Sequence, residues 1–525
     1  MMRVVILCVV LTLLGSHCCD GAKILLAFPT PSRSHMIFAS ALMKGLAAKG
    51  HDVTVMSAFP QEKPLKNYRD IVVTPNDAIK ELLKTVTTKD VGSQAGFFSR
   101  FNEIIDLTLA SANDSLHQEP WQKVMREESF DLVIVGFFFN NFLIGLGDHF
   151  KCPVVSIFSA GISEMINSPS GNPAAVASVP HLFLGKVKEM TFMPRLKTFL
   201  FNIVEKFLMK YMDYKENKYY ESVFPSPKYR SYEEMKKNVS LYFANEHFST
   251  SAPRPVIPNV VEVGGLHIKS KPDPLPQNLQ EFMDGAEHGV VFFSLGSNVK
   301  SSLLPPEKLD AIIKTFGKLK QRVLFKWEAD TLSNQPKNVM TQKWMPQDDI
   351  LAHKNVRVFV SHGGLGGVTE AKFHGVPIVG IPFFADQMTN LASAQDEGWA
   401  VTLDLKDLTE ETFSRAINEV INNQKYKNVV QEISNLFTDR PLAALETAIF
   451  WTEYIIRHHG APHLQSHAVH LNFLQRNSID VIVFLVVVLF VAFKIAAFSL
   501  CFCWRKITKS SGAAASPKYK KAKTN

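Results

Sequence analysis

Short apolar runs alternate with amphipathic stretches through the first half of the chain. Four runs are apolar enough to be strands buried on both faces, at residues 23–28, 53–56, 131–135 and 154–158. Between the first two runs lies a helical pattern over residues 36–49, which ends at Gly50. Because a strand, a helix and a second strand in this order form a βαβ unit, we expect a parallel sheet.

A second series of the same kind follows a cluster of prolines at residues 251–265, where we expect a domain boundary. Its expected strands are residues 289–295, 322–327, 356–361 and 378–381, with helices at 306–319, at 368–374 and from Thr409. The pattern predicts two doubly wound α/β domains, at residues 23–255 and 256–445, with the ligand between them. A last helical pattern covers residues 441–459. We assign residues 446–479 to a return helix and a juxtamembrane stretch.

One segment of the first half differs from this alternation. Residues 190–220 are rich in Phe, Met, Leu and Lys and have an amphipathic pattern. Two interpretations stay open, a pair of core helices or a surface that lies on a membrane or over an acceptor site.

Two longer apolar segments predict the topology. Residues 4–14 follow Arg3 and precede small residues, the layout of a secretory signal peptide, which we place at residues 1–22. Residues 480–504 are long enough to span a bilayer and carry one basic residue, Lys494. The tail at 505–525 holds seven Lys/Arg and no acidic residue. We therefore expect a single-pass type I protein of the endoplasmic reticulum membrane, with the main part lumenal and the tail cytosolic.

Charge and composition narrow the classes of partner. The formal net charge of +8 comes mostly from the tail, so it gives little support to nucleic-acid binding. Lys521 and Lys523, near the C-terminus, resemble a retrieval signal of endoplasmic-reticulum membrane proteins. Asn113 and Asn238 open glycosylation sequons. Of six cysteines only Cys152 clearly falls in the lumenal part, so we expect no intramolecular disulfide there.

Four glycines within five positions mark residues 359–371, "FVSHGGLGGVTEA". They lie where an expected strand turns into a helix. Bare backbone N–H groups at such a point can bind a phosphate, but a tight turn that needs positive φ angles gives the same pattern. This stretch alone leaves both interpretations open.

The motifs around it resemble the UDP-glycosyltransferase family. The resemblance rests on "WMPQDDILAH" (344–353), the glycine segment and "GVPIVGIPFFADQMTN" (375–390), with "VGGLH" (263–267) and "VFFSLGS" (291–297) in support. It covers nearly the whole chain, more loosely in the first half. It implies a GT-B fold whose C-terminal domain holds the UDP-sugar, and inverting transfer to a hydroxyl of a small lipophilic acceptor. UDP-sugar is then a co-substrate, and we expect no cofactor and no metal; homo-oligomerisation stays open.

The resemblance assigns donor-binding roles to residues whose chemistry suits them. Trp344 offers a face for a uracil ring and Gln347 an amide for its edge. Glu370 accepts hydrogen bonds from the ribose hydroxyls, and Asp386 and Gln387 hold the sugar hydroxyls. The expected diphosphate contacts come from Ser294, Gly296, Ser297, His362, Gly364, Gly366 and Gly367. Lys326 is a further expected donor-binding residue, at a position where vertebrate relatives often have Arg.

The resemblance also makes His35, in "SRSH", the general base. A neutral imidazole accepts a hydroxyl proton near neutral pH. Relatives orient this histidine with a carboxylate just after the strand "FDLVIV", where this chain has Gly136. The alternative is therefore a non-catalytic protein of the same fold that binds lipophiles or nucleotides. A second departure, Gly366-Gly367 in place of an Asn and a small residue, is typical of invertebrate members and favours glucose over glucuronic acid.

Overall fold

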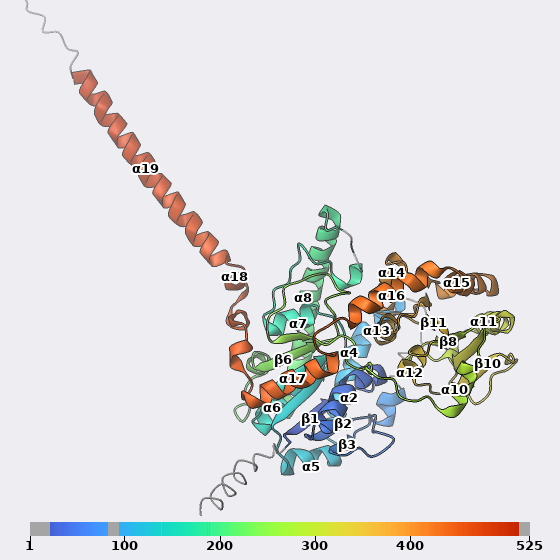
Figure 1. Ribbon diagram of the computed structural model, residues 1–525. Helices are drawn as coiled ribbons and strands as arrows, with labels where there is room; N and C mark the ends of the chain where they lie inside the picture. Colours follow the sequence, from blue (N-terminus) through green and yellow to red (C-terminus); the bar gives the residue numbers. More distant parts are fainter. Residues whose placement is uncertain (1–20, 82–93, 138, 186, 188, 514–525) are drawn as a thin grey trace, which may run out of the picture. The chain divides into compact units, whose positions relative to one another are not determined.

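The computed structural model describes residues 21–81, 94–137, 139–185, 187 and 189–513. One compact unit runs to Ser466 and contains two parallel sheets (Figure 1). The first sheet has the order β3-β2-β1-β4-β5-β6-β7. Its strands are β1 (Lys23–Phe28), β2 (Asp52–Ser57), β3 (Tyr68–Val72), β4 (Leu132–Phe137), β5 (Val154–Phe158), β6 (Val239–Ala244) and β7 (Val260–Glu262).

Helices cover both faces of the first sheet because its strands are apolar on both faces. Ile24 and Leu26 of β1 pack with α2 (Arg33–Ala48) and α17 (Ala444–Arg457). Leu25 and Ala27, which point the other way, pack with the remaining helices of this domain. These are α4 (Gln94–Leu116), α5 (Glu119–Glu127), α6 (Gly145–Phe150), α7 (Glu164–Ser170), α8 (Phe192–Val223) and α9 (Tyr232–Lys236).

The second sheet has the order β10-β9-β8-β11-β12-β13, and all of its pairings are parallel. Its strands are β8 (Val290–Ser294), β9 (Arg322–Lys326), β10 (Val339–Gln342), β11 (Val356–Ser361), β12 (Ile378–Gly380) and β13 (Ala400–Thr402). One face carries α11 (Pro306–Lys318) and α15 (Glu410–Asn422). The other face carries α10 (Gln277–Asp284), α12 (Gln347–Leu351), α13 (Leu365–Phe373), α14 (Gln387–Asp396) and α16 (Gln424–Thr438).

The predicted class of two doubly wound α/β domains is confirmed, and the structure refines their limits. The first sheet continues through β7, past the expected end at residue 255. The last helix before Ser466, α17, contributes Ala448 and Ile449 to the core beneath α2. The chain therefore returns to the first domain after it has built the second.

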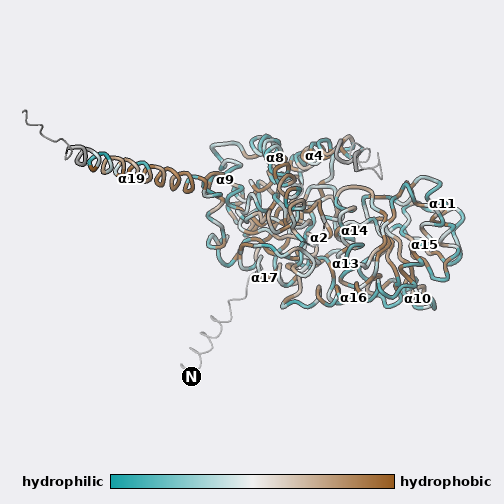
Figure 2. Tube along the Cα trace, turned by 90° about the horizontal axis from the view of Figure 1, so that it is seen from above, coloured by the Kyte–Doolittle hydropathy of each residue, from teal (hydrophilic) through white to brown (hydrophobic). Residues whose placement is uncertain are grey.

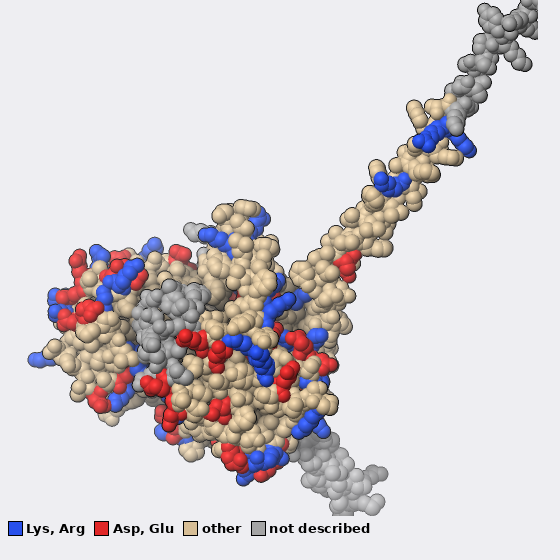
Figure 3. All heavy atoms as spheres, turned by 180° about the vertical axis from the view of Figure 1, so that it is seen from behind, with Lys and Arg blue, Asp and Glu red and all other residues tan. Residues whose placement is uncertain are grey.

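The amphipathic segment at 190–220 is nearly all one long helix, α8, so of the two open interpretations the pair of core helices is excluded. Only Thr198, Met212, Glu216 and Tyr220 of α8 are buried. Phe192, Phe207 and other large apolar side chains are exposed. In Figure 3 the knob at the top of the view, which contains the start of α8, is mostly uncharged.

The second unit, from His467, contains α18 (Phe473–Arg476) and α19 (Ile479–Ala513). Within the described residues one helical stretch, Ile479–Thr508, is long and apolar enough to cross a membrane. Figure 2 shows the hydrophobic colour along this helix. The finding agrees with the anchor expected at 480–504. The expected signal segment, apart from residues 21 and 22, and Lys521 and Lys523 lie outside the described residues.

The two sequons differ in accessibility. Asn238 is exposed between α9 and β6. Asn113 lies within α4, and its side-chain oxygen is buried. The side chain of Asn238 is therefore exposed, whereas that of Asn113 is half-buried within a helix.

Candidate functional site

Three neighbouring strands of the second sheet end beside one another and begin the site. Ser361 at the end of β11 is the register partner of Ser294 at the end of β8. Each hydroxyl oxygen accepts a backbone N–H two residues later, from Gly363 at 3.1 Å and from Gly296 at 3.3 Å. Lys326 ends β9, the strand on the other side of β8. The carboxyl ends of these parallel strands thus place the expected phosphate residues along one edge.

The glycines around this edge make room for the ring of His362. A Cβ at Gly364 would lie 2.5 Å from Nε2 of His362, and one at Gly296 would lie 2.6 Å from its Cε1. Gly363 has a φ of +84°, which a side chain would strain. Close packing of an imidazole therefore explains Gly364, a positive φ explains Gly363, and both apply to Gly296, whose φ is +77°.

Gly366 and Gly367 lie in the first turn of α13, because this helix begins at Leu365, earlier than the glycine content suggests. A Cβ at Gly366 would meet only Nε2 of His267, at 3.8 Å. A Cβ at Gly367 would lie 3.2 Å from Nε2 of Gln347. The helix N-terminus therefore carries little side-chain bulk, which suits an anion-binding turn.

His362 is neutral near physiological pH. Burial, together with the positive charge of Lys326, lowers the pKa of His362 to about 4. Its Nδ1 is buried and has no hydrogen-bond partner among the described residues. The Nζ of Lys326 lies 2.8 Å from a carboxylate oxygen of Glu328. A buried polar nitrogen without a partner beside a lysine can bind a phosphate group at little additional desolvation cost.

Glu370 is buried on α13 and contacts two polar side chains. One carboxylate oxygen accepts a hydrogen bond of 2.5 Å from the amide nitrogen of Gln347, the first residue of α12. The other lies 3.5 Å from Nε2 of His267, whose Nδ1 is buried without a partner among the described residues. The structure thus joins the expected uracil and ribose residues and adds His267. The sequence placed His267 within a family motif, but it gave no signal for this contact.

Trp344 is 46% exposed and lies at the junction with the first domain. The guanidinium carbon of Arg33, the first residue of α2, lies 4.2 Å from the centre of its ring. Further along α2, the ring of Phe38 lies 6.0 Å from that of His267. His35 is between these two contacts on the same helix. The structure therefore brings the expected base and the expected uracil platform to one boundary between the sheets.

His35 is half-buried in the first turn of α2. Burial lowers its pKa to about 4, so the imidazole is neutral at neutral pH. Its Nδ1 lies 2.6 Å from the hydroxyl of Ser32 and 3.3 Å from that of Ser34. The neutral imidazole lies at the start of α2, next to the domain that is expected to bind the donor, and it can accept a proton.

Asp386 is tied to the glycine loop through a residue that sequence reasoning missed. The amide nitrogen of Asn390 donates to a carboxylate oxygen of Asp386 at 2.8 Å and to the carbonyl of Gly363 at 3.0 Å. Burial raises the pKa of Asp386. The expected sugar-binding carboxylate therefore has a fixed position relative to the strand-to-helix turn.

Gln387 and Ser297, two further expected donor-binding residues, lie in surroundings that differ from each other. The side-chain oxygen of Gln387 accepts the backbone N–H groups of Phe383 at 2.9 Å and Phe384 at 3.1 Å. This oxygen therefore holds its own loop. Ser297 is half-buried in the turn after β8.

The position of the missing carboxylate is filled. Gly136 lies on β4, and the alternation of this strand directs position 136 toward α2, like Ile134. A Cβ at Gly136 would lie 1.8 Å from Cδ2 of Phe28, whose ring is buried. An aromatic ring from β1 thus occupies the space that a side chain at position 136 needs.

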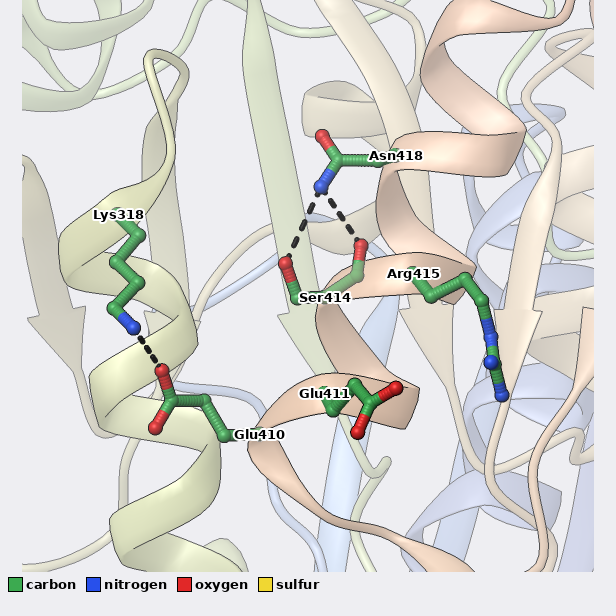
Figure 4. A pocket seen from close by; sticks show the side chains of 6 residues that line it. All are labelled: Lys318, Glu410, Glu411, Ser414, Arg415 and Asn418. Atoms are coloured by element: carbon green, nitrogen blue, oxygen red, sulfur yellow. Dashed lines mark hydrogen bonds and ion pairs between the residues drawn. The ribbon is translucent and has the colours of Figure 1, made fainter.

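Other parts of the described chain offer weaker sites. A polar surface pocket lies between α11 and α15 (Figure 4). Its side chains pair with one another, as Lys318 with Glu410 and Asn418 with Ser414, and none of the expected donor residues lines it. No group of three or more His, Cys, Asp or Glu suited to a metal occurs in the part of the chain that the structure describes.

Solved structures share the architecture of this chain. The UDP-glucosyltransferase from Polygonum tinctorium capable of glucosylating indoxyl aligns with a TM-score of 0.54 at 15% identity, over 83% of this chain and 99% of that chain. The UDP-glucose: anthocyanidin 3-O-glucosyltransferase in complex with UDP aligns with a TM-score of 0.51 at 16% identity, with the same coverage. At these identities the likeness shows the fold, which is GT-B.

Sequence comparison shows the family. The family model described as UDP-glucoronosyl and UDP-glucosyl transferase matches residues 22–514. The chain is 38% identical over 478 residues to UDP-glucosyltransferase 2 of Dactylopius coccus, covering 89% of this chain and 90% of that protein. It is 31% identical over 491 residues to UDP-glucuronosyltransferase 1A6 of Mus musculus, covering 90% of each. The chain therefore belongs to the UDP-glycosyltransferase family, whose members transfer a sugar from a UDP-sugar.

Proposed function

We propose that this protein transfers glucose from UDP-glucose to a hydroxyl group of a small lipophilic acceptor, with inversion at the anomeric carbon. The observation that carries the proposal is the junction of α2 with the donor side. Arg33 contacts Trp344, and Phe38 contacts His267, on either side of His35 along the helix. An acceptor bound to the first domain near His35 would face a donor held by the second.

Charge at the phosphate edge supports glucose over glucuronic acid. Lys326 is already paired with Glu328 at 2.8 Å, so this pair adds no net positive charge for a sugar carboxylate. A glucuronate carboxylate near Glu328 would meet a like charge. The name of the Dactylopius coccus relative, UDP-glucosyltransferase 2, agrees with this choice.

The reaction we propose is a single displacement. The acceptor hydroxyl gives its proton to the imidazole of His35 while its oxygen attacks the anomeric carbon. The bond from that carbon to the diphosphate oxygen breaks, and UDP leaves with the electron pair. An α-linked donor then gives a β-glycoside. In this proposal the side chain of His362 and the N-terminus of α13 stabilise the charge on the leaving diphosphate.

A binding protein without activity is the competing proposal, motivated by Gly136. A carboxylate beside the base fixes its tautomer and stabilises the imidazolium, and removing the charge from a serine-protease triad costs about 10⁴ in rate. The two proposals differ in whether UDP-glucose turns over when a phenol is present.

We also propose that the catalytic part lies in the lumen of the endoplasmic reticulum. The expected signal segment, the candidate span Ile479–Thr508 and the basic residues from Arg505 support this orientation.

The test uses the full-length protein in detergent with UDP-glucose and a panel of phenols, and detects glucosides by mass spectrometry. The wild type should form glucosides, and His35→Ala should reduce the rate at least about a hundredfold, the scale of general-base catalysis. His117→Ala, at an exposed histidine of the first domain, should keep full activity. UDP binding without any product would favour the binding protein.

A further inference from the structure

Ser32 occupies the N-cap position of α2 but does not cap it. Its backbone is extended, with φ −115° and ψ 103°, and its side chain makes no cap hydrogen bond. A serine at this position ordinarily accepts the N–H of the second or third helical residue, which stabilises the helix. Here its oxygen instead lies 2.6 Å from Nδ1 of His35, the third residue of the helix.

The backbone on both sides holds this hydroxyl in place. The N–H of Ser32 donates to the carbonyl of Thr30 at 2.8 Å, and the carbonyl of Ser32 accepts the N–H of Met36 at 3.0 Å. The residue is 8% exposed. The contact with His35 is therefore made by a fixed, buried hydroxyl.

The space that a carboxylate side chain at position 136 would need in order to approach His35 is filled. The ring of Phe28 fills the space beside Gly136, where an added Cβ would lie 1.8 Å from Cδ2 of that ring. A group that orients the imidazole at Nδ1 therefore has to come from another direction, and Ser32 reaches this nitrogen from the start of α2.

We propose that Ser32 is a positioning residue that holds the ring of His35 through Nδ1, and that acceptors with acidic hydroxyls, such as phenols, are therefore preferred. This inference rests on the proposed role of His35 as the base. In the tautomer that serves as the base, the Ser32 oxygen accepts the hydrogen of Nδ1, and Nε2 carries the lone pair that takes the proton of the acceptor. A neutral hydroxyl orients the ring, but it stabilises the imidazolium less than a carboxylate would. A phenol, with a pKa of about 10 as in tyrosine, gives up its proton more readily than an aliphatic alcohol.

The chain offers a matched control. Ser34 is also in the first turn of α2 and also approaches Nδ1 of His35, but at 3.3 Å and from an exposed position. Ser32→Ala, Ser32→Thr and Ser34→Ala, made in the full-length protein, thus separate the buried hydroxyl from a general effect of changing this turn.

The measurement is kcat with UDP-glucose for a series of substituted phenols of similar size and decreasing acidity. Ser32→Ala should lower kcat about threefold to tenfold, the effect of losing one neutral hydrogen bond. The loss should grow as the phenol becomes less acidic, and UDP binding by calorimetry should not change. Ser32→Thr should keep most of the activity, and Ser34→Ala should lower kcat less than Ser32→Ala does.

Three results would overturn the inference while leaving His35 as the base. They are a normal kcat for Ser32→Ala, an equal loss in Ser34→Ala, and a loss in Ser32→Thr as large as in Ser32→Ala. Full activity of His35→Ala would instead refute the base itself, so the two failures are distinguishable.

Discussion

Phe28 and Gly136 give a prediction that depends on their close approach. Even a methyl group at position 136 would overlap the Phe28 ring, because the added Cβ lies 1.8 Å from Cδ2, 2.6 Å from Cε2 and 2.9 Å from Cγ. Forcing extra volume into a packed core costs about 1–3 kcal/mol. At roughly 2–4 °C for each kcal/mol in a domain of about 150–250 residues, Gly136→Ala should lower Tm by about 2–12 °C.

Gly136→Asp should destabilise the protein more than Gly136→Ala. The aspartate causes the same overlap and also brings a carboxylate into an apolar core, where an unpaired charge is costly. The comparison of the two variants separates overlap from charge. An aspartate at position 136 therefore supplies an orienting carboxylate only if Phe28 moves.

A double-mutant cycle tests whether Phe28 is the cause. Phe28→Ala alone should lose about 3–5 kcal/mol through the cavity that it leaves. In the double variant the new methyl group enters that cavity, so the loss should be smaller than the sum, by about 0.5–3 kcal/mol. Urea denaturation of the detergent-solubilised protein measures the free energy of unfolding of the wild type, the two single variants and the double variant. If Gly136→Ala is as stable as the wild type, or if the two losses simply add, the packing argument is refuted.

The other predictions concern the donor site, pH, glycosylation and the anchor. Glu370→Ala should weaken UDP binding about tenfold to a hundredfold, since a hydrogen bond to a charged group contributes about 1.5–3 kcal/mol; an unchanged dissociation constant in calorimetry would contradict the assignment. Because burial lowers the pKa of His35 to about 4, the neutral imidazole persists as pH falls, and kcat should stay level down to about pH 5; a loss centred near pH 6.5 would count against this. Asn238→Gln should remove a glycan that an endoglycosidase detects, whereas Asn113→Gln should leave the glycan pattern unchanged. Deleting residues 480–525 should release the protein from membranes in alkaline carbonate, and a truncated protein that still pellets would indicate a second anchor.

The buried strands were the most predictable part of the fold. Residues 23–28, 154–158 and 356–361 are strands with the expected limits, because continuous apolar runs between turn residues have few alternatives. The short edge strands β7 and β13 have three residues each, too few for a pattern.

The family motifs indicated residues of the second domain that the structure brings together, but not how they contact one another. The start of α13 was expected after the glycines, because glycine disfavours helices, yet the helix begins at Leu365 and includes two of them. The contacts of His267 with Glu370 and of Asn390 with Asp386 join segments that lie apart in the chain or that tertiary structure orients. No local pattern encodes the contact of His267 with Glu370, whereas Asp386 and Asn390 have the i,i+4 spacing of neighbours on a helix.

The position of Gly136 shows the same limit in the first domain. The sequence indicated a missing carboxylate, but only the structure shows that Phe28 fills its place and that Ser32 lies beside His35. The first fact depends on packing between β1 and β4, and the second on where α2 begins.

The central claim is inverting glucosyl transfer, and one competition experiment tests it directly. The full-length protein is given equal concentrations of UDP-glucose and UDP-glucuronic acid with one phenol, and NMR of the product identifies the sugar and its anomeric configuration. We predict mainly the β-glucoside. A glucuronide as the main product, or an α-linked sugar, would contradict the account.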